Sequence, residues 1–371
     1  MMPAPSSPSL PPPTPLSVLP APTPLSVVRA AVGRLLALDA GRGATAAVPV
    51  AREAVRRIPE LRADPAGLYG RTGGAGRDRM AELAALAELA ELCEVIGWIL
   101  FDAGRYRAAQ RMNVRALALA ELCGDRWTAR LVRLNHSMLQ ARTGRPRAAM
   151  ATAAHVAGPR PLPARVDSLV LVRQAHAAAA LGGRTEAQRL ISRARSRFLD
   201  GVSRHDPHWA WWIDQAELTG HEGWVMAGLG RWNRAVPLLH EAATAPGPSY
   251  RHLFTAELLA ALAGAGAWTE TADLAADIAP RAAGIGSVRT TERLSATAAD
   301  LLRRPRVPRR ARDAAVHLLE SLPPTARARR GPPGAGPPRP APCERPLMSP
   351  IHIRRCRRPS ACRCALSSRS A

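Results

Sequence analysis

Five glycines recur through the middle of this chain, and each one separates two segments with helical periodicity. They stand at Gly104, Gly144, Gly182, Gly230 and Gly266, so that successive steps are 40, 38, 48 and 36 residues. Glycine tolerates the left-handed backbone conformation that ends a helix and opens a tight turn. The series predicts consecutive helix–turn–helix units, and because one such hairpin cannot bury its own apolar face, it predicts stacked neighbours.

Small residues follow most of these glycines at matching offsets. The alanine pairs, each with members seven residues apart, are Ala109 and Ala116, Ala187 and Ala194, and Ala235 and Ala242. The unit after Gly144 is degenerate, since Ala149 is followed by Val156. The pattern is that of a tetratricopeptide unit, although the steps exceed the roughly 34 residues of the strict repeat. We therefore expect longer helices or inserted loops, with Gly97 and Gly223 at close helix crossings.

The stretch from 200 to 245 holds five of the eight tryptophans. Asp206 followed by Pro207 is a helix-start signal, and it predicts a helix through Trp209 and Trp212 that continues to Gly230. On such a helix Trp209 and Trp212 share one face. Two interpretations stay open at this point: the two rings pack in the core, or they anchor a bound peptide.

Composition supports an all-α fold, because apolar residues make up 47% of the chain and aromatic residues only 4%. A core of alanine and leucine suits close-packed helices and argues against a β-sandwich or barrel. We predict a tetratricopeptide-like solenoid of αα-hairpins over residues 28–302, which contains a glycine-rich linker at 62–77. We expect residues 1–27 to form a disordered proline-rich arm. We expect residues 303–371 to form a mostly disordered tail rich in proline and arginine, with one further helix at 312–322.

The charge is concentrated near one end of the chain. All 52 basic residues are arginine, and the formal net charge is +23. Residues 303–371 hold seventeen arginines against Asp313, Glu320 and Glu344, so the remainder is only mildly basic. An arginine-rich tail can hold phosphates without reading base sequence, and we expect nucleic-acid contact only through it.

The sequence contains no catalytic or metal-binding motif that would indicate an enzyme. The chain has neither a GxSxG motif nor a phosphate-binding loop, and Asp102 and Asp214 are more simply helix-cap or groove residues than acid–base groups. Residues of metal-ligand type do cluster, but they lack the HExxH pattern and zinc-finger spacing. They are His205, His208, His221 and Glu222, of which we interpret the histidines as solvated loop groups, and His352, Cys356, Cys362 and Cys364 in the tail. We predict no enzyme activity, no cofactor and no metal.

Targeting signals are lacking as well. The first residues have no basic segment followed by an apolar run, and no stretch of about 18 uncharged apolar residues occurs. We therefore expect a cytoplasmic protein without membrane contact. Cys93 and Cys123 lie in helical segments and are expected to be buried thiols in a reducing compartment.

Several runs of sequence resemble one known family. These runs are LLALDAGRGA (35–44), ELCEVIGWILFDAGRYRAAQRMNVRALALAELCGD (91–125), FLDGVSRHDPHWAWWIDQAELTGHEG (198–223) and GRWNRAVPLL (230–239). Together they resemble the C-terminal tetratricopeptide-like region of actinobacterial XRE-family (helix-turn-helix) transcriptional regulators. The resemblance covers roughly 28–302 and implies regulation of transcription, with the repeats binding a partner or effector. The family's N-terminal DNA-binding domain would precede Leu35, where this sequence has the proline-rich arm.

In a solenoid of this type the helix before each turn glycine lines the concave face, and aromatic, methionine and carboxylate side chains there suit a protein or peptide partner. The opposing interpretation is that half of these residues pack between repeats. The candidate partner-binding residues are Glu94, Trp98, Phe101, Asp102, Leu134, Asn135, Met138, Arg142, His176, Trp209, Trp212, Glu217 and Trp224.

These observations favour a protein–protein interaction or regulatory module. Two alternatives remain: a DNA-associated regulator that uses the basic tail for non-specific phosphate contact, and a sensor of a small-molecule or peptide effector.

Overall fold

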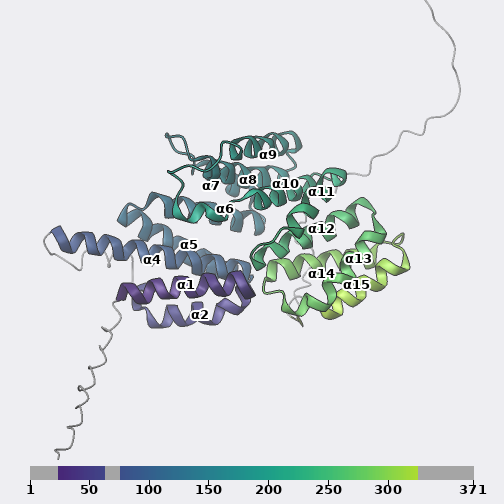
Figure 1. The fold of residues 1–371 in the computed structure, drawn as a ribbon, viewed down its shortest axis with the longest axis horizontal. Coiled ribbons are helices and arrows are strands. Elements are labelled where there is room, and N and C mark those ends of the chain that lie inside the picture. Colours follow the sequence, from purple (N-terminus) through teal and green to yellow (C-terminus); the bar gives the residue numbers. More distant parts are fainter. Residues whose placement is uncertain (1–23, 63–75, 325–371) are drawn as a thin grey trace, which may run out of the picture. The chain divides into compact units, whose positions relative to one another are not determined.

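The described part of the chain is entirely helical. The computed structural model describes residues 24–62 and 76–324, and within them it has fourteen α-helices, four short 3-10 helices and no strand (Figure 1). The α-helices are α1 (Pro24–Arg42), α2 (Ala44–Arg57), α4 (Gly76–Asp102), α5 (Tyr106–Cys123), α6 (Arg126–Arg142), α7 (Pro146–Ala154), α8 (Ala164–Ala180), α9 (Arg184–Phe198), α10 (Gln215–Gly228), α11 (Trp232–Thr244), α12 (His252–Ala265), α13 (Trp268–Ile278), α14 (Val288–Arg303) and α15 (Arg309–Ser321). The 3-10 helices are η1 (Pro59–Leu61), η2 (His208–Trp212), η3 (Ser249–Arg251) and η4 (Ala279–Gly284).

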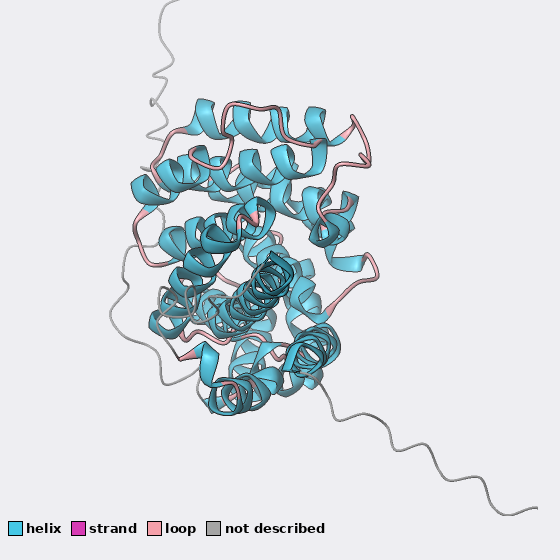
Figure 2. Ribbon diagram, turned by 90° about the vertical axis from the view of Figure 1, so that its left-hand side faces the viewer, coloured by secondary structure: helices cyan, strands magenta, loops and turns pink. Residues whose placement is uncertain are grey.

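The helices pack as sequential pairs. Helix α4 packs on α5, α6 on α7, α8 on α9 and α10 on α11, and only loops and 3-10 turns connect them (Figure 2). A second set of contacts joins alternate helices, since α4, α6, α8, α10, α12 and α14 each meet the next member of that series. We call these the inner helices. Pairing of neighbours together with contact between alternate helices is consistent with a helical repeat.

The five predicted turn glycines are confirmed. Their φ angles are 70° at Gly104, 77° at Gly144, 80° at Gly182, 71° at Gly230 and 75° at Gly266, all in the left-handed region. The close crossings are confirmed as well. A Cβ on Gly97 would lie 2.4 Å from Asn113 Oδ1, and one on Gly223 would lie 2.8 Å from Leu239 Cγ.

The expected small residues have no exposed surface. Ala109, Ala116, Ala187, Ala194, Ala235 and Ala242 are all fully buried. They belong to hydrophobic clusters that follow one another along the chain, the first spanning α1 to α6, the next α8 to α12, and the last α12 to α15. Each helix pair therefore completes its core with side chains from its neighbours.

The continuous helix expected from Asp206 to Gly230 is wrong. Residues His208–Trp212 form the short 3-10 helix η2, and α10 begins only at Gln215. The break comes at Asp214, whose extended backbone and side chain cap the new helix by accepting the Glu217 N–H at 2.9 Å. Within η2, Trp209 is buried while Trp211 is 68% exposed.

Helix α2 begins at Ala44 and contains Pro49. Helix α4 begins at Gly76, inside the range 62–77 expected to be a glycine-rich linker. The helix expected at 312–322 is present as α15, and its Leu318 is fully buried against α13 and α14. The packed helices therefore extend past residue 302. Most of the proline-rich arm (1–23), most of the linker (63–75) and the tail from 325 onward lie outside the described residues.

Two loops that are far apart in sequence meet at glycines. The Thr45 N–H, in the first turn of α2, donates to the Gly286 carbonyl at 2.8 Å. A Cβ on Gly286 would lie 1.9 Å from the Arg42 carbonyl oxygen, so only glycine permits this approach. The turn between α1 and α2 is thereby attached to the loop that precedes α14.

Within residues 24–62 and 76–324, none of the helices combines the length and apolarity that would be needed to span a bilayer.

Candidate functional site

Arg289, in the first turn of α14, lies among residues that the sequence assigns to the concave face. Its guanidinium carbon is 4.7 Å from the centroid of the Phe101 ring and 5.7 Å from that of Trp98. Its Nε lies 3.6 Å from Asp102 Oδ1, and one terminal nitrogen lies 3.9 Å from the Met138 sulfur. Both members of the ion pair are buried, so α14 itself fills this part of the inner helix surface.

A second residue of α14 pairs with the next inner helix. Glu292 Oε2 accepts a hydrogen bond from Arg142 at 2.6 Å, and Arg142 also donates from Nε to the Tyr106 hydroxyl at 3.1 Å. The Arg142 side chain is 42% exposed, so this pair forms the solvent-facing rim of the arrangement.

Burial dominates the electrostatics around Arg289. The Asp39 carboxylate accepts a hydrogen bond from the Trp98 indole at 3.0 Å, yet burial, reinforced by the negative charge of Asp102, raises the pKa of Asp39 to about 6. Burial also raises the pKa of Asp102, while Arg289 and the hydroxyl of Ser287, a 3.0 Å donor, act in the opposite direction.

A histidine pair occupies the adjoining inner surface of α8 and α10. His176 Nε2 and His221 Nδ1 are 2.9 Å apart, and the Trp224 ring packs against His176 at 4.5 Å. Burial lowers the pKa of both histidines well below the ordinary value, so both are neutral at pH 7. Our interpretation of His221 as a solvated loop group is wrong, because it lies inside α10 and is buried.

Glu217 links the histidine pair to η3. Its carboxylate lies 3.3 Å from His221 Nε2 and 3.5 Å from Arg251 Nε, and Arg251 also donates to Asp214 at 2.6 Å. Burial raises the pKa of Glu217 to about 7, against the opposing effect of Arg251 and Arg173. Asp214 is thus both a helix cap and an ion-pair partner, which fits the cap role expected for it.

We call these residues the inner cluster. Its members are Trp98, Phe101, Asp102, Met138, Arg142, Arg173, His176, Glu217, His221, Trp224, Arg251, Arg289 and Glu292.

The remaining predicted site residues lie elsewhere. Asn135 donates to Glu94 at 2.7 Å in a buried pair between α6 and α4, where burial raises the Glu94 pKa to about 8. Leu134 and Trp209 are buried in a separate hydrophobic cluster, and the half-buried Trp212 packs against it. For these residues the structure agrees with the packing interpretation that the sequence left open.

Several buried polar atoms of the inner cluster have no hydrogen-bond partner. They include Asp102 Oδ2 and Arg173 Nε. Asp39 Oδ1, next to the cluster, also lacks a hydrogen-bond partner. A buried polar atom without a partner costs about 1–3 kcal/mol. Such atoms also occur outside the inner cluster, among them Asn113 Oδ1 and Trp209 Nε1.

Sequence reasoning missed Arg173, Arg251, Arg289 and Glu292. A signal existed for α14, because Ser287 is an N-cap residue whose side chain accepts the Thr290 N–H. It could locate the helix, but it could not show that α14 lies against α4 and α6.

Within the described ranges, no group of three or more histidine, cysteine, aspartate or glutamate side chains is arranged to hold a metal ion. No model of a known protein family matches the chain, and no curated protein matches it either. The fold defines the class: an all-helical protein whose described helices pack as sequential pairs.

Proposed function

We propose that this chain is an interaction or regulatory module of the tetratricopeptide-repeat transcriptional-regulator type, which binds a protein or peptide partner at the inner cluster. The resemblance of the sequence to the repeat region of XRE-family regulators supports this proposal. So does the sequential pairing of helices, because repeats of this kind present an extended surface made from many helices.

The observation that carries the proposal is the composition of the inner cluster. A solenoid needs only apolar contacts between its inner helices, whereas this one gathers charged, histidine and tryptophan side chains from five inner helices and from η3. Removing charges from water is costly unless their partners are well placed, and several atoms here lack partners. Rigid aromatic and arginine side chains of this kind are enriched at binding hot spots.

The members that a partner is expected to touch are the exposed Arg142 and the half-buried Met138, His176 and Trp224. Helix α14 already covers Phe101 and Asp102 through Arg289. A bound peptide would therefore contact the rim of the inner cluster rather than its buried centre.

The test is a comparison of two double variants in affinity capture from a lysate of the source organism. The rim variant combines Met138→Ala and Arg142→Ala. The matched control combines Leu199→Ala and Arg234→Ala, at exposed positions outside the inner cluster. We expect a partner that the wild type and the control retain and the rim variant loses. Equal retention by both variants, or no capture by folded wild type, would contradict the proposal.

A second candidate function follows from the charge of the tail. Seventeen arginines after residue 302 suit non-specific phosphate contact, so the chain would associate with DNA through the tail. A gel shift that weakens steeply with salt and disappears on deletion of residues 323–371 would support it. Absence of a shift at low salt would exclude it.

A further inference from the structure

Two adjoining cavities lie at the start of α6, on a part of the repeat that the inner cluster does not use. Their volumes are about 740 Å³ and about 350 Å³, and both are lined by Gly124, Asp125, Arg126 and Arg130. The loop after α7 supplies further walls, with Gly158 in the smaller cavity and Pro159, Arg160 and Leu162 in the larger. Glu121 of α5 also lines the smaller cavity, and Ser203 and His205 also line the larger one.

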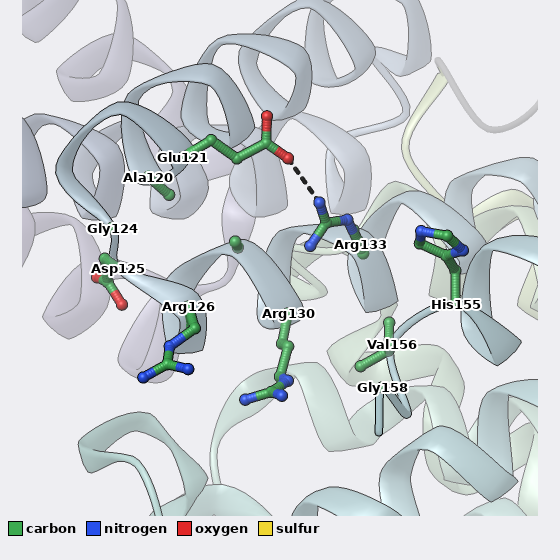
Figure 3. Close-up of a pocket in the computed structure, with 11 residues that line it drawn as sticks. Ala120, Glu121, Gly124, Asp125, Arg126, Arg130, Arg133, His155, Val156 and Gly158 are labelled. Atoms are coloured by element: carbon green, nitrogen blue, oxygen red, sulfur yellow. Dashed lines mark hydrogen bonds and ion pairs between the residues drawn. The ribbon is translucent and has the colours of Figure 1, made fainter. Parts of the chain in front are cut away.

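The cavities have an excess of positive charge. Arg126, Arg130 and Arg133 are four and three residues apart, so they follow one face of α6, and Arg160 faces them from the loop. Figure 3 shows Arg126 and Arg130 projecting into the same space, while Arg133 turns toward Glu121. Four arginines therefore face two carboxylates, those of Glu121 and Asp125.

Both carboxylates are already engaged. Glu121 accepts a hydrogen bond from Arg133 at 2.5 Å. Asp125 caps α6 by accepting the N–H groups of Trp127 and Thr128, each at 3.0 Å. Within residues 24–62 and 76–324, no carboxylate pairs with Arg126, Arg130 or Arg160.

Arg130 is held in position without a counterion. Its guanidinium carbon lies 4.7 Å from the centroid of the Trp127 ring, a cation–π contact that uses none of its N–H donors. Partial burial, and then the neighbouring charges of Arg126 and Arg133, lower the pKa of Arg130. The chain therefore bears an electrostatic cost at this position that a bound anion would relieve.

We propose that this cavity binds a small organic anion, whose phosphate or carboxylate group is clamped by Arg126 and Arg130 and whose apolar part packs on Leu162 and the flanking prolines. Guanidinium groups match both kinds of oxyanion through paired N–H donors. The volume suits a small molecule rather than a folded partner. The site is independent of the inner cluster, so it stands or falls separately from the proposed partner-binding function.

The first experiment measures whether a bound anion protects the cavity arginines from chemical modification in the full-length chain. Phenylglyoxal modifies accessible arginine side chains, and peptide mass spectrometry then gives the modification rate at Arg126 and Arg130 individually. The probes are inorganic pyrophosphate and citrate, tested separately at physiological ionic strength. We expect one of them to slow modification of both arginines while exposed Arg234 is unaffected. Pyrophosphate protection alone indicates a phosphate ligand, and citrate protection alone a carboxylate ligand.

The second experiment separates this cavity from the arginine-rich tail. Calorimetry compares two double variants. The cavity variant combines Arg126→Gln and Arg130→Gln. The matched control combines Arg231→Gln and Arg234→Gln, which removes the same charge from α11 and the turn before it. We expect the cavity variant to bind the protecting anion about tenfold more weakly, the loss of one or two charge-assisted hydrogen bonds, with the control unchanged. No protection by either probe, or equal weakening in both variants, would overturn the proposal.

Discussion

Arg289 and Arg130 each hold a guanidinium 4.7 Å from the centre of an aromatic ring, yet they differ in burial and in their carboxylate partners. Arg289 is buried, and the chain supplies its counterion in Asp102. Arg130 lines an open cavity, has two further arginines near it, and lacks a carboxylate partner among the described residues.

The difference shows that net charge says little about where a basic protein binds anions. In the inner cluster, Arg289 is paired with a carboxylate of the chain and joins α14 to α4. In the cavity, arginine is left without such a partner and is available to a ligand. What separates the two uses is whether a carboxylate lies within reach of the guanidinium. Asp102 lies 3.6 Å from Arg289, whereas Glu121 pairs with Arg133 and Asp125 caps α6.

The largest expected effect comes from removing the buried guanidinium. Arg289→Met leaves Asp102 buried without its ion-pair partner, and breaking a buried pair in this way costs about 3–5 kcal/mol. Urea unfolding followed by circular dichroism measures the change. A loss below about 1 kcal/mol, the range of an exposed pair, would remove the distinction drawn between the two arginines.

A smaller effect is expected from the buried carboxylate of Glu217, and it depends on pH. The folded-state pKa is raised to about 7, so the folded chain binds this proton more tightly than the unfolded chain does. The stability contributed by the group is therefore complete below its ordinary pKa near 4.5 and is lost as pH rises through 7.

Glu217→Gln removes this dependence. The stability of the wild type relative to the variant should fall by about 1–3 kcal/mol between pH 5 and pH 8. Urea unfolding at each pH provides the measurement, and Glu241→Gln, a change in the neighbouring helix α11, serves as the control. A pH-independent difference would mean that Glu217 is ionised throughout that range.

The rim of the inner cluster should show an intermediate effect. Arg142 and Glu292 form an ion pair with one partner 42% exposed and the other 18% exposed. A double-mutant cycle with Arg142→Ala and Glu292→Ala should give a coupling energy of about 0.5–1 kcal/mol, which falls as salt is added. A coupling as large as the Arg289 effect would place this pair with the buried centre.

The smallest effect on stability is expected in the cavity. Arg130→Met retains apolar contact with Trp127 and removes a charge that two neighbouring arginines disfavour. The free energy of unfolding should therefore change by less than about 0.5 kcal/mol. Thermal unfolding in the absence of added anion is the measurement. A loss above about 2 kcal/mol would show that Arg130 supports the fold as Arg289 does.

The sequential pairing of helices was predictable because local chemistry determines it. The left-handed glycines, the buried alanines and the close crossings at Gly97 and Gly223 all follow from backbone sterics and small side chains. The break before α10 was not predicted, although Asp214 is a good capping residue, because Asp206 and Pro207 gave an earlier start signal of the same kind.

Only part of the candidate site was predictable from the sequence. Trp98, Phe101, Asp102, Met138 and Arg142 were identified from their distance to turn glycines. Their partners Arg289 and Glu292 are about 150–190 residues away in sequence, and no local pattern indicates a contact over that separation. The cavity was missed although Arg126, Arg130 and Arg133 share a helix face, since that spacing describes an ordinary solvated surface equally well.

The contact between Gly286 and the turn at Arg42 and Gly43 has a consequence for how the chain unfolds. In a repeat array whose members touch only adjacent members, the terminal units open first and independently. Here the pair α1 and α2 is hydrogen-bonded to the segment preceding α14. Opening of this pair therefore also breaks its contact with Gly286. Hydrogen exchange of the Thr45 amide should therefore report the cooperative unfolding of the array rather than local fraying of its beginning.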